Sequence, residues 1–379
     1  MDPFVHVRTS YAHVIMDNPI LYSESIIVKT ETSGLACEIS SFAAMGCGQP
    51  AGAVGARSGI MDSVRRFAVL VALLALAAGQ VVGQEALPVP STDLTKPLLL
   101  SPERRKEFEA AMKARNYIRA ETLLVEAINA NPKSPELLKL AAGVFFLHGQ
   151  HLNAAIAFKK AEKLEPLDDA SRFTLAMAYV ALERRDWARP ELQKLAGARP
   201  ENPLYIYWLA RLDYDEQKFA AAVEKLNKAI ALRPEFMKAH DNLGLNLEAL
   251  GKHDEARKSY EEAIRLNRLQ KPSSPWPPLN LAIMLLKLGK GEEAEPYLRE
   301  ALDYNPKMAE ARYRLGTLLE KQGKNDEAIK ELTEAAALDP DYPEPQYALA
   351  RLYRQLGDPE KAQAALKEFQ RRKSVRRKG

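Results

Sequence analysis

Cysteine is almost absent from this chain of 379 residues. Its two cysteines, Cys37 and Cys47, both lie within the first sixty residues. The rest of the chain therefore offers no disulfide, no thiolate metal site and no cysteine nucleophile. Such a protein tolerates an oxidising compartment, because nothing in it can be oxidised into a wrong disulfide.

An excess of charge of one sign is also missing from the body of the chain. The sequence holds 54 basic and 50 acidic residues, and the last nine residues, RRKSVRRKG, contain six of the basic ones and no acid. Residues 84–370 are therefore nearly neutral. A groove for nucleic acid needs a basic stripe, so we predict no nucleic-acid partner.

Motifs that carry chemistry are absent as well. The sequence contains no HExxH, no GxSxG, no phosphate-binding loop and no paired cysteine motif. His148 and His151 stand three residues apart, but they lie in a predicted loop without a nearby acid to complete a metal site. We therefore predict no metal, no cofactor and no enzymatic activity.

An apolar run of twelve residues, Phe67–Ala78, stands well inside the chain. Arg65 and Arg66 precede it, and the small-residue pattern Ala75-Leu76-Ala77 or Val81-Val82-Gly83 provides a cleavage site. The run is shorter than the ~20 apolar residues that cross a bilayer. Residues 61–83 are predicted to be a secretory signal, with an uncleaved membrane anchor or a buried helix as alternatives. The protein is expected to be exported, to a bacterial periplasm or outside the cell.

The segments on either side of this signal have little pattern. Residues 1–60 are rich in Gly, Ala and Ser and have no sustained period, which predicts disorder. Because a signal normally stands first, we expect translation to start at Met61 and residues 1–60 to lie upstream of the true start. Residues 84–100 contain three prolines and are predicted to be an extended linker.

From residue 101 the chain repeats itself every 34 residues. A proline closes each of several similar phrases, such as EAINANP and EALDYNP, and the prolines fall into two series spaced by 34: Pro132, Pro166, Pro200 and Pro234, then Pro306 and Pro340. Arg268 stands where the proline between the series is missing. Residues 271–274, KPSS, are an insert that explains the extra four residues. The predicted units are therefore 101–270 with five repeats, 275–370 with three, and a basic tail at 371–379.

This repeat resembles the tetratricopeptide repeat (TPR) family. Counting from the first residue of each repeat, the family pattern has small residues at positions 8 and 20, large ones at 4, 7, 11 and 24, and proline at 32. Position 20 is alanine in all eight repeats, from Ala120 to Ala362. The repeat that starts at residue 135 matches at the other positions as well, except that Ala141 stands at position 7. The resemblance implies an all-α fold, a right-handed α-solenoid of about eight helix–turn–helix units.

The physical reasons for this pattern are simple. Small side chains at positions 8 and 20 let two antiparallel helices cross closely, glycine ends the first helix, and proline stops the second. One repeat cannot bury its own apolar face, so stacking builds one continuous core. The first repeat carries Glu107 and Phe108 at positions 7 and 8, which is expected of a terminal cap. The insert is expected to shift the stack locally and to divide five repeats from three.

The resemblance also implies where a partner would bind. In the family, positions 2, 5, 9 and 12 of each first helix face the concave groove, and an asparagine ladder at position 6 can hold a peptide. Tyr207 with Arg211, and Tyr347 with Arg351, are pairs at i, i+4 on one face of a helix; Tyr and Arg are enriched at binding hot spots. The alternative is that the tyrosines pack between helices and the arginines are solvated. The predicted partner-binding residues are Lys139, Phe173, Met177, Tyr207, Arg211, Tyr214, Asp241, Asn242, Trp276, Asn280, Tyr313, Tyr347 and Arg351.

The function expected from these features is a non-catalytic scaffold that binds a peptide or protein partner in its concave groove. The alternative is a substrate-recruiting subunit of a separate enzyme or of an envelope-assembly or secretion complex. The basic tail could make weak contact with anionic membranes, or it could simply oppose the dipole of the last helix. The sequence does not predict the oligomeric state.

Overall fold

The computed structural model describes residues 100–376, with side chains up to residue 374. The predicted signal, the segment before it and almost all of the linker lie outside these residues. The described part contains sixteen helices and no strand, which confirms the all-α prediction. It divides into two compact units, residues 100–132 and residues 133–376.

The first unit is one helical pair. Helix α4 spans Pro102–Lys113 and helix α5 spans Tyr117–Ala130. Ser101 and Asn116 cap the two helices by accepting a hydrogen bond from a backbone N–H three residues later. Phe108, the large residue at a position where the pattern has a small one, is buried.

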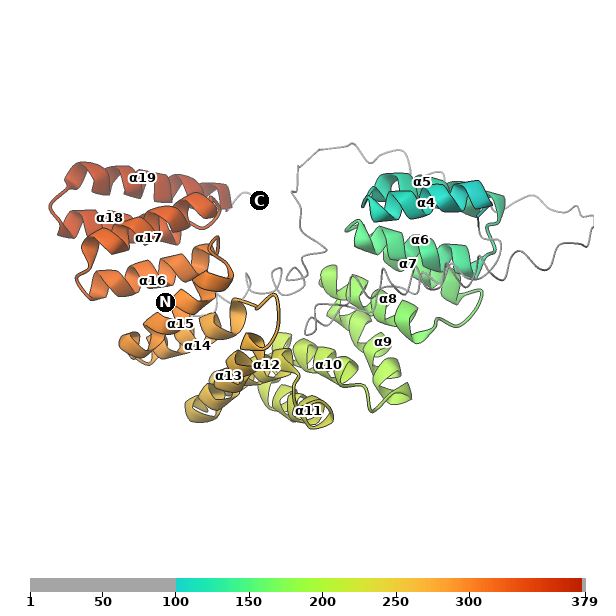
Figure 1. The fold of residues 1–379 in the computed structure, drawn as a ribbon, viewed down its shortest axis with the longest axis horizontal. Helices are drawn as coiled ribbons and strands as arrows, with labels where there is room; N and C mark the ends of the chain where they lie inside the picture. The colour runs from blue at the N-terminus through green and yellow to red at the C-terminus, as the bar shows by residue number, and fades with distance from the viewer. Residues whose placement is uncertain (1–99, 377–379) are drawn as a thin grey trace, which may run out of the picture. The chain divides into compact units, whose positions relative to one another are not determined.

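The second unit holds seven repeats of two helices each, and Figure 1 shows that the helices follow one another in chain order. Each helix packs against the next, and first helices also contact the first helix of the following repeat in several places, as in α10 with α12 and α12 with α14. The helices are α6 Pro135–Leu147, α7 His151–Glu162, α8 Asp169–Ala181, α9 Arg185–Ala198, α10 Pro203–Asp215, α11 Phe219–Leu232, α12 Met237–Ala249, α13 His253–Arg268, α14 Trp276–Lys287, α15 Gly291–Tyr304, α16 Ala309–Lys321, α17 Asn325–Leu338, α18 Glu344–Gln355 and α19 Pro359–Arg376.

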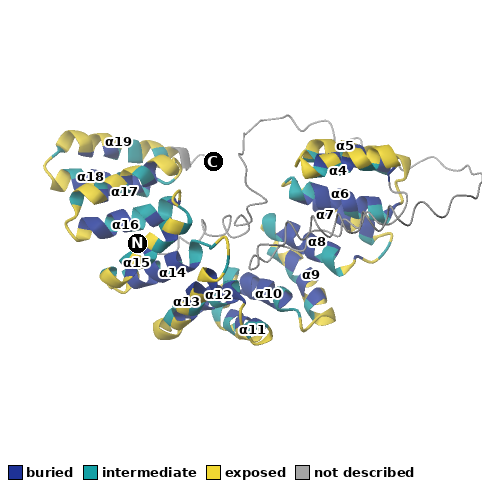
Figure 2. Cartoon of the chain, in the orientation of Figure 1, coloured by how far each residue is buried: buried dark blue, intermediate teal, exposed yellow. Residues whose placement is uncertain are grey.

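Buried residues form the inner side of every helical pair, as the dark blue bands in Figure 2 show. The alanine at position 20 is fully buried in the first seven repeats and nearly so in the last. Its burial confirms the predicted helix crossing. Each first helix is followed by a residue with positive φ, two positions after the helix ends. This residue is glycine in five repeats: Gly149, Gly251, Gly289, Gly323 and Gly357.

The proline at position 32 sets the length of the second helices. Helices α9, α11, α15 and α17 all end at position 30, two residues before that proline. Helix α13 has Arg268 in its place and continues through position 32. The guanidinium of Arg268 then reaches Glu300 in the next repeat, through hydrogen bonds of 2.8 and 2.7 Å.

The four-residue insert forms a closed loop between α13 and α14. The side chain of Asn267, which is fully buried, donates to the Ser274 carbonyl and accepts from the Ser274 N–H, both at 2.7 Å. Helices α13 and α14 still pack directly against each other. The boundary between the two compact units lies at residue 132.

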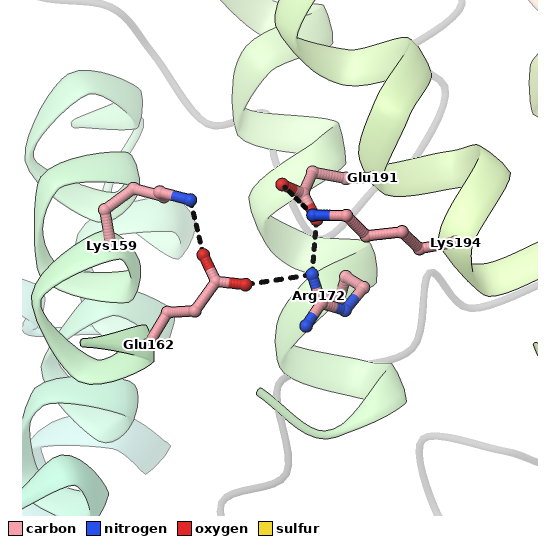
Figure 3. Close-up of polar contacts among 5 residues, drawn as sticks. All are labelled: Lys159, Glu162, Arg172, Glu191 and Lys194. Carbon is pink, nitrogen blue, oxygen red and sulfur yellow. Dashed lines mark hydrogen bonds and ion pairs between the residues drawn. The ribbon is translucent and has the colours of Figure 1, made fainter. Parts of the chain in front are cut away.

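Charged side chains also join neighbouring repeats, and Figure 3 shows one such cluster on helices α7, α8 and α9. Arg172 of α8 contacts Glu162 of α7 at 2.9 Å and also pairs with Glu191 of α9, which Lys194 approaches at 3.2 Å. Burial disfavours the charged Glu162 carboxylate, but hydrogen bonds from Lys159 and Arg172 outweigh this and lower its pKa.

The same pairing occurs in a later repeat. Arg172 and Arg312 both occupy position 4, where the family pattern has a large residue, and Glu191 and Glu331 both occupy position 23. Arg312 contacts Glu331 at 2.6 Å, and each side chain is largely shielded from solvent. The 34-residue pattern alone did not predict this pair.

The start of the basic tail belongs to helix α19. Arg371 and Arg372 both pair with Glu368, and Arg372 also donates to the Ala336 carbonyl at 2.7 Å near the end of α17. These two cations therefore have structural partners. From Leu100 to Arg376, no helix has the length and apolar character needed to cross a membrane.

Candidate partner-binding face

Five of the predicted residues come together on the first helices of three successive repeats. We call Tyr207, Arg211, Asp241, Asn242 and Asn280 the α10–α14 cluster. The Tyr207 hydroxyl oxygen of α10 accepts from Arg211 Nη1 at 3.1 Å and from Asn242 Nδ2 of α12 at 3.3 Å. Asn280 Nδ2 of α14 donates to both carboxylate oxygens of Asp241, at 3.0 and 3.1 Å. Hydrogen bonds thus connect each of these helices to the next.

The centre of the cluster is shielded from solvent. Tyr207 is 2% exposed and Arg211 is 6% exposed. Burial raises the pKa of Tyr207, although the nearby Arg211 acts in the opposite direction. The Tyr207 ring packs on Phe236 with centroids 4.9 Å apart, and Arg233 lies 4.0 Å above Phe236. Phe236 therefore holds the ring of Tyr207, while Arg211 and Asn242 hold its hydroxyl.

Two acceptors in the cluster remain open. The side-chain carbonyl oxygens of Asn242 and Asn280 accept no hydrogen bond from any described residue. Asn280 is half-buried, and Asn242 is 7% exposed. Their amide nitrogens are already committed, to Tyr207 and the Lys238 carbonyl in one case and to Asp241 in the other. The orientation of both side chains is thus set, with the oxygen left to accept.

Half-buried side chains surround the cluster. Tyr214 packs edge-on against Phe219 at 5.6 Å, and burial raises the pKa of Tyr214. Trp276 begins α14 and is also half-buried, as are Leu245 and Ile283 at position 9 of their repeats. Leu245 and Ile283 each follow an asparagine of the cluster by three residues, which places apolar surface on the same side of the helix.

A second polar group, not predicted from the sequence, lies beside the cluster. The Tyr260 hydroxyl of α13 donates to Glu248 at 3.0 Å, and Lys287 of α14 donates to the other Glu248 oxygen at 2.7 Å. Glu248 occupies position 12, one of the positions that the family resemblance implies should face the groove, but it is not among the predicted residues. Tyr260 lies on a second helix at position 24, where the family pattern predicts a large core residue.

The other predicted residues lie elsewhere. Phe173 and Met177 have almost no exposed surface and belong to the core of the stack, where Phe173 packs on Tyr205 at 5.6 Å. Lys139 pairs with Glu165 and lies 3.9 Å from Asp168.

Near the C-terminus, the predicted residues have separate partners. Tyr313 packs on Tyr342 at 5.3 Å, and Tyr347 packs on Phe369 at 5.3 Å. Arg351 donates from Nε to Glu320 at 2.9 Å and not to Tyr347. The second predicted Tyr–Arg pair therefore does not form the hydrogen bond that joins Tyr207 and Arg211.

A buried carboxylate lies at the end of α10, outside the cluster. Burial raises the pKa of Asp215 to about 8, and the neighbouring Glu216 adds to the shift. Arg185 donates to Asp215 at 3.1 Å, which acts against the shift. Its guanidinium is much more exposed to solvent than the carboxylate, and the end of a helix disfavours negative charge, so burial has the larger effect.

Comparison with known proteins fits the repeat pattern. One sequence model of the tetratricopeptide repeat matches residues 105–169, 173–235 and 279–343, about half of the chain, and two others match 237–269 and 319–372. No group of three or more potential metal ligands occurs among residues 100–376.

Two solved structures and one curated protein illustrate the likeness. The TPR repeat-containing protein YpiA of Bacillus subtilis (strain 168) is 29% identical over 175 residues, which are 45% of this chain and only 40% of YpiA. A tetratricopeptide repeat protein from Parabacteroides merdae gives a TM-score of 0.53 at 17% identity, over 62% of this chain and 92% of that one. Yeast Tom70 gives a TM-score of 0.51 at 21% identity, over 67% of this chain and 55% of that one. The structures agree in fold, and the sequence matches identify the repeat: this chain belongs to the tetratricopeptide repeat family.

Proposed function

We propose that the protein is a non-catalytic scaffold that binds a peptide or protein partner on the face of α10, α12 and α14. The observation that carries this proposal is the pair of open acceptors, Asn242 and Asn280, on adjacent repeats. An extended peptide presents backbone N–H groups that such acceptors can bind. Because hydrogen bonds already fix both amides, binding costs less conformational entropy.

The surroundings of these acceptors support a peptide ligand. Tyr214, Leu245 and Ile283 provide half-buried apolar surface for side chains of the ligand, while the open oxygens bind its backbone. Sites of this kind combine mainly apolar contact with a few fixed polar groups. The α10–α14 cluster contains no nucleophile next to a base, and the sequence has none of the catalytic motifs considered above.

A selection with a displayed library of random peptides tests the site. Peptides recovered on the full chain are measured against Asn242→Ala, Asn280→Ala and the control Asn227→Ala, an exposed residue on α11. Loss of one hydrogen bond predicts roughly tenfold weaker binding for each cluster variant and no change for the control. Equal binding by all variants, with unchanged unfolding midpoints, would reject the site.

We also propose that the protein is exported, with Met61 as the true start. Arg65, Arg66 and the apolar run up to Ala78 support this proposal, although they lie outside the described residues. Intact mass measurement of the native protein would give a mature N-terminus close to residue 78 or 84. A mass that includes residues 1–60 would overturn it.

Capture of the tagged protein after mild cross-linking in its own cells distinguishes the scaffold from a recruiting subunit. A partner without catalytic activity that is lost from Asn242→Ala supports the scaffold. An enzyme that copurifies in fixed proportion would favour the recruiting subunit instead.

A further inference from the structure

The outward face of helix α7 has an unusual composition. Leu152, Ile156, Lys160 and Lys163 follow at intervals of four, four and three residues, which places them on one side of the helix. We call these four residues the α7 face. Leu152 is 56% exposed and Ile156 is 45% exposed. Both lysines are exposed, and neither pairs with another described residue.

The other second helices differ at the same four repeat positions, 18, 22, 26 and 29. Each of them carries at least one acidic residue there: Glu126 in α5, Asp186 in α9, Glu224 in α11, Asp254 in α13, Glu292 in α15, Asp326 in α17 and Glu360 in α19. Among the eight second helices of residues 100–376, α7 alone combines aliphatic and basic residues with no acid. The difference shows that ordinary packing of the repeat does not require this composition.

We propose that the α7 face docks on an anionic lipid surface. Aliphatic side chains on one face of a helix lower their free energy by entering the boundary between lipid headgroups and acyl chains. Lysines at the same face extend their ammonium groups to anionic headgroups, and each contributes to binding near such a surface. Protein interfaces are instead depleted in lysine, so the composition favours lipid over a protein partner.

A local probe tests the docking without interference from other segments. In the full chain with Cys37→Ser and Cys47→Ser, a fluorophore is attached at Asn153→Cys, next to Leu152. The matched control places it at Glu255→Cys, which is exposed and has the same repeat position in α13. Vesicles of phosphatidylcholine and phosphatidylglycerol with acyl chains brominated close to the headgroup quench a fluorophore that lies at the boundary between headgroups and acyl chains.

We expect quenching at residue 153 and none at residue 255. Each of Lys160→Gln and Lys163→Gln should raise the vesicle concentration for half-maximal quenching about fivefold, and vesicles of phosphatidylcholine alone should fail to quench. The double variant Leu152→Gln, Ile156→Gln should lose quenching almost completely. Because these residues are exposed, circular dichroism should show the same helix content in every variant.

Three results would overturn the proposal. Equal quenching at residues 153 and 255 would show attachment through another part of the chain. Absence of quenching at residue 153 with phosphatidylglycerol present would show that the face does not meet lipid. Self-association in sedimentation without vesicles, if Leu152→Gln with Ile156→Gln abolishes it, would assign the face to a protein interface.

Discussion

The ring of Tyr260 lies against the backbone of Gly244 so closely that no side chain fits between them. A Cβ placed on Gly244 would come within 2.5 Å of Tyr260 Cε1 and 2.9 Å of Cγ. Tyr260 is fully buried, and its hydroxyl is bound to Glu248. The ring therefore cannot move aside, and the crossing of α12 and α13 depends on glycine at this point.

Gly244→Ala should destabilise the protein by about 1–3 kcal/mol, because the added methyl overpacks this crossing. The measurement is the urea midpoint of the full chain. Gly197→Ala in α9 is the control, since a Cβ there meets no atom within 4 Å. That change should stabilise by about 0.5–1 kcal/mol, as alanine favours helix. A harmless Gly244→Ala would contradict the register.

Asn267→Ala should lower the free energy of unfolding by about 1–3 kcal/mol, because it leaves the Ser274 N–H and carbonyl without their partner. Hydrogen exchange at the Ser274 amide should speed up more than exchange elsewhere in α13. Ser273→Ala, which removes a bond to the Gln270 carbonyl in the same loop, is the milder comparison. If both variants behave alike, Asn267 does not hold the insert.

Arg172→Met should destabilise by about 3 kcal/mol, because it removes the main partner of the buried Glu191. The double variant Arg172→Met, Glu191→Met should recover most of this loss, since two apolar side chains leave no buried charge. Thermal melts of the two single variants and the double variant complete the cycle. A double variant no more stable than Arg172→Met would show that the loss does not come from leaving the Glu191 carboxylate without its partner.

The stability of the chain should depend on pH through Asp215. Its pKa of about 8 lies above the value of 3.8 for a free carboxyl, so the folded state holds the proton more tightly than the unfolded state. Stability therefore falls as the pH rises from about 4 to about 8. Asp215→Asn should reduce this fall. Urea midpoints of the unmodified protein and of Asp215→Asn, measured at about pH 4 and about pH 8, test this prediction. An identical fall in the two proteins would show that Asp215 is ionised at neutral pH.

Tyr207→Phe should lower the free energy of unfolding by about 1–2 kcal/mol, because Arg211 Nη1 and Asn242 Nδ2 lose a buried acceptor. Tyr347→Phe, which alters an exposed tyrosine, should change the urea midpoint very little. Alanine at both Tyr207 and Arg211 is a poor test of binding, because both side chains are buried and their removal opens the core. If Tyr207→Phe is neutral, the hydroxyl does not organise the cluster.

Much of the fold could be predicted from the spacing of small residues and prolines. The buried alanines at position 20 and the helix ends before each proline follow directly from the 34-residue period. The extension of α13 through Arg268 is the expected result where the proline is missing. These features depend on local sequence, so the repeating pattern of residue types is enough to predict them.

The candidate site could be predicted only in part, because burial depends on residues outside the first helices. Position 5 of the repeat was expected to face a partner, yet Phe236 and Tyr342, both at position 34, pack on Tyr207 and Tyr313. The spacing placed Asn242 and Asn280 in adjacent repeats but did not show which neighbour fixes each amide. Contacts such as Asp241 with Asn280 join residues 39 apart, across the insert, so the regular period does not reveal them.

The pairing of Arg172 with Glu191, and of Arg312 with Glu331, bears on how such a protein can lengthen. Both partners lie inside one repeat, so duplication of a whole repeat copies the pair intact. A recombination event between positions 4 and 23 would instead join an arginine to a repeat without its glutamate, or the reverse. Viable exchanges should therefore occur near the prolines, where a repeat can be gained or lost without leaving a charge alone in the core.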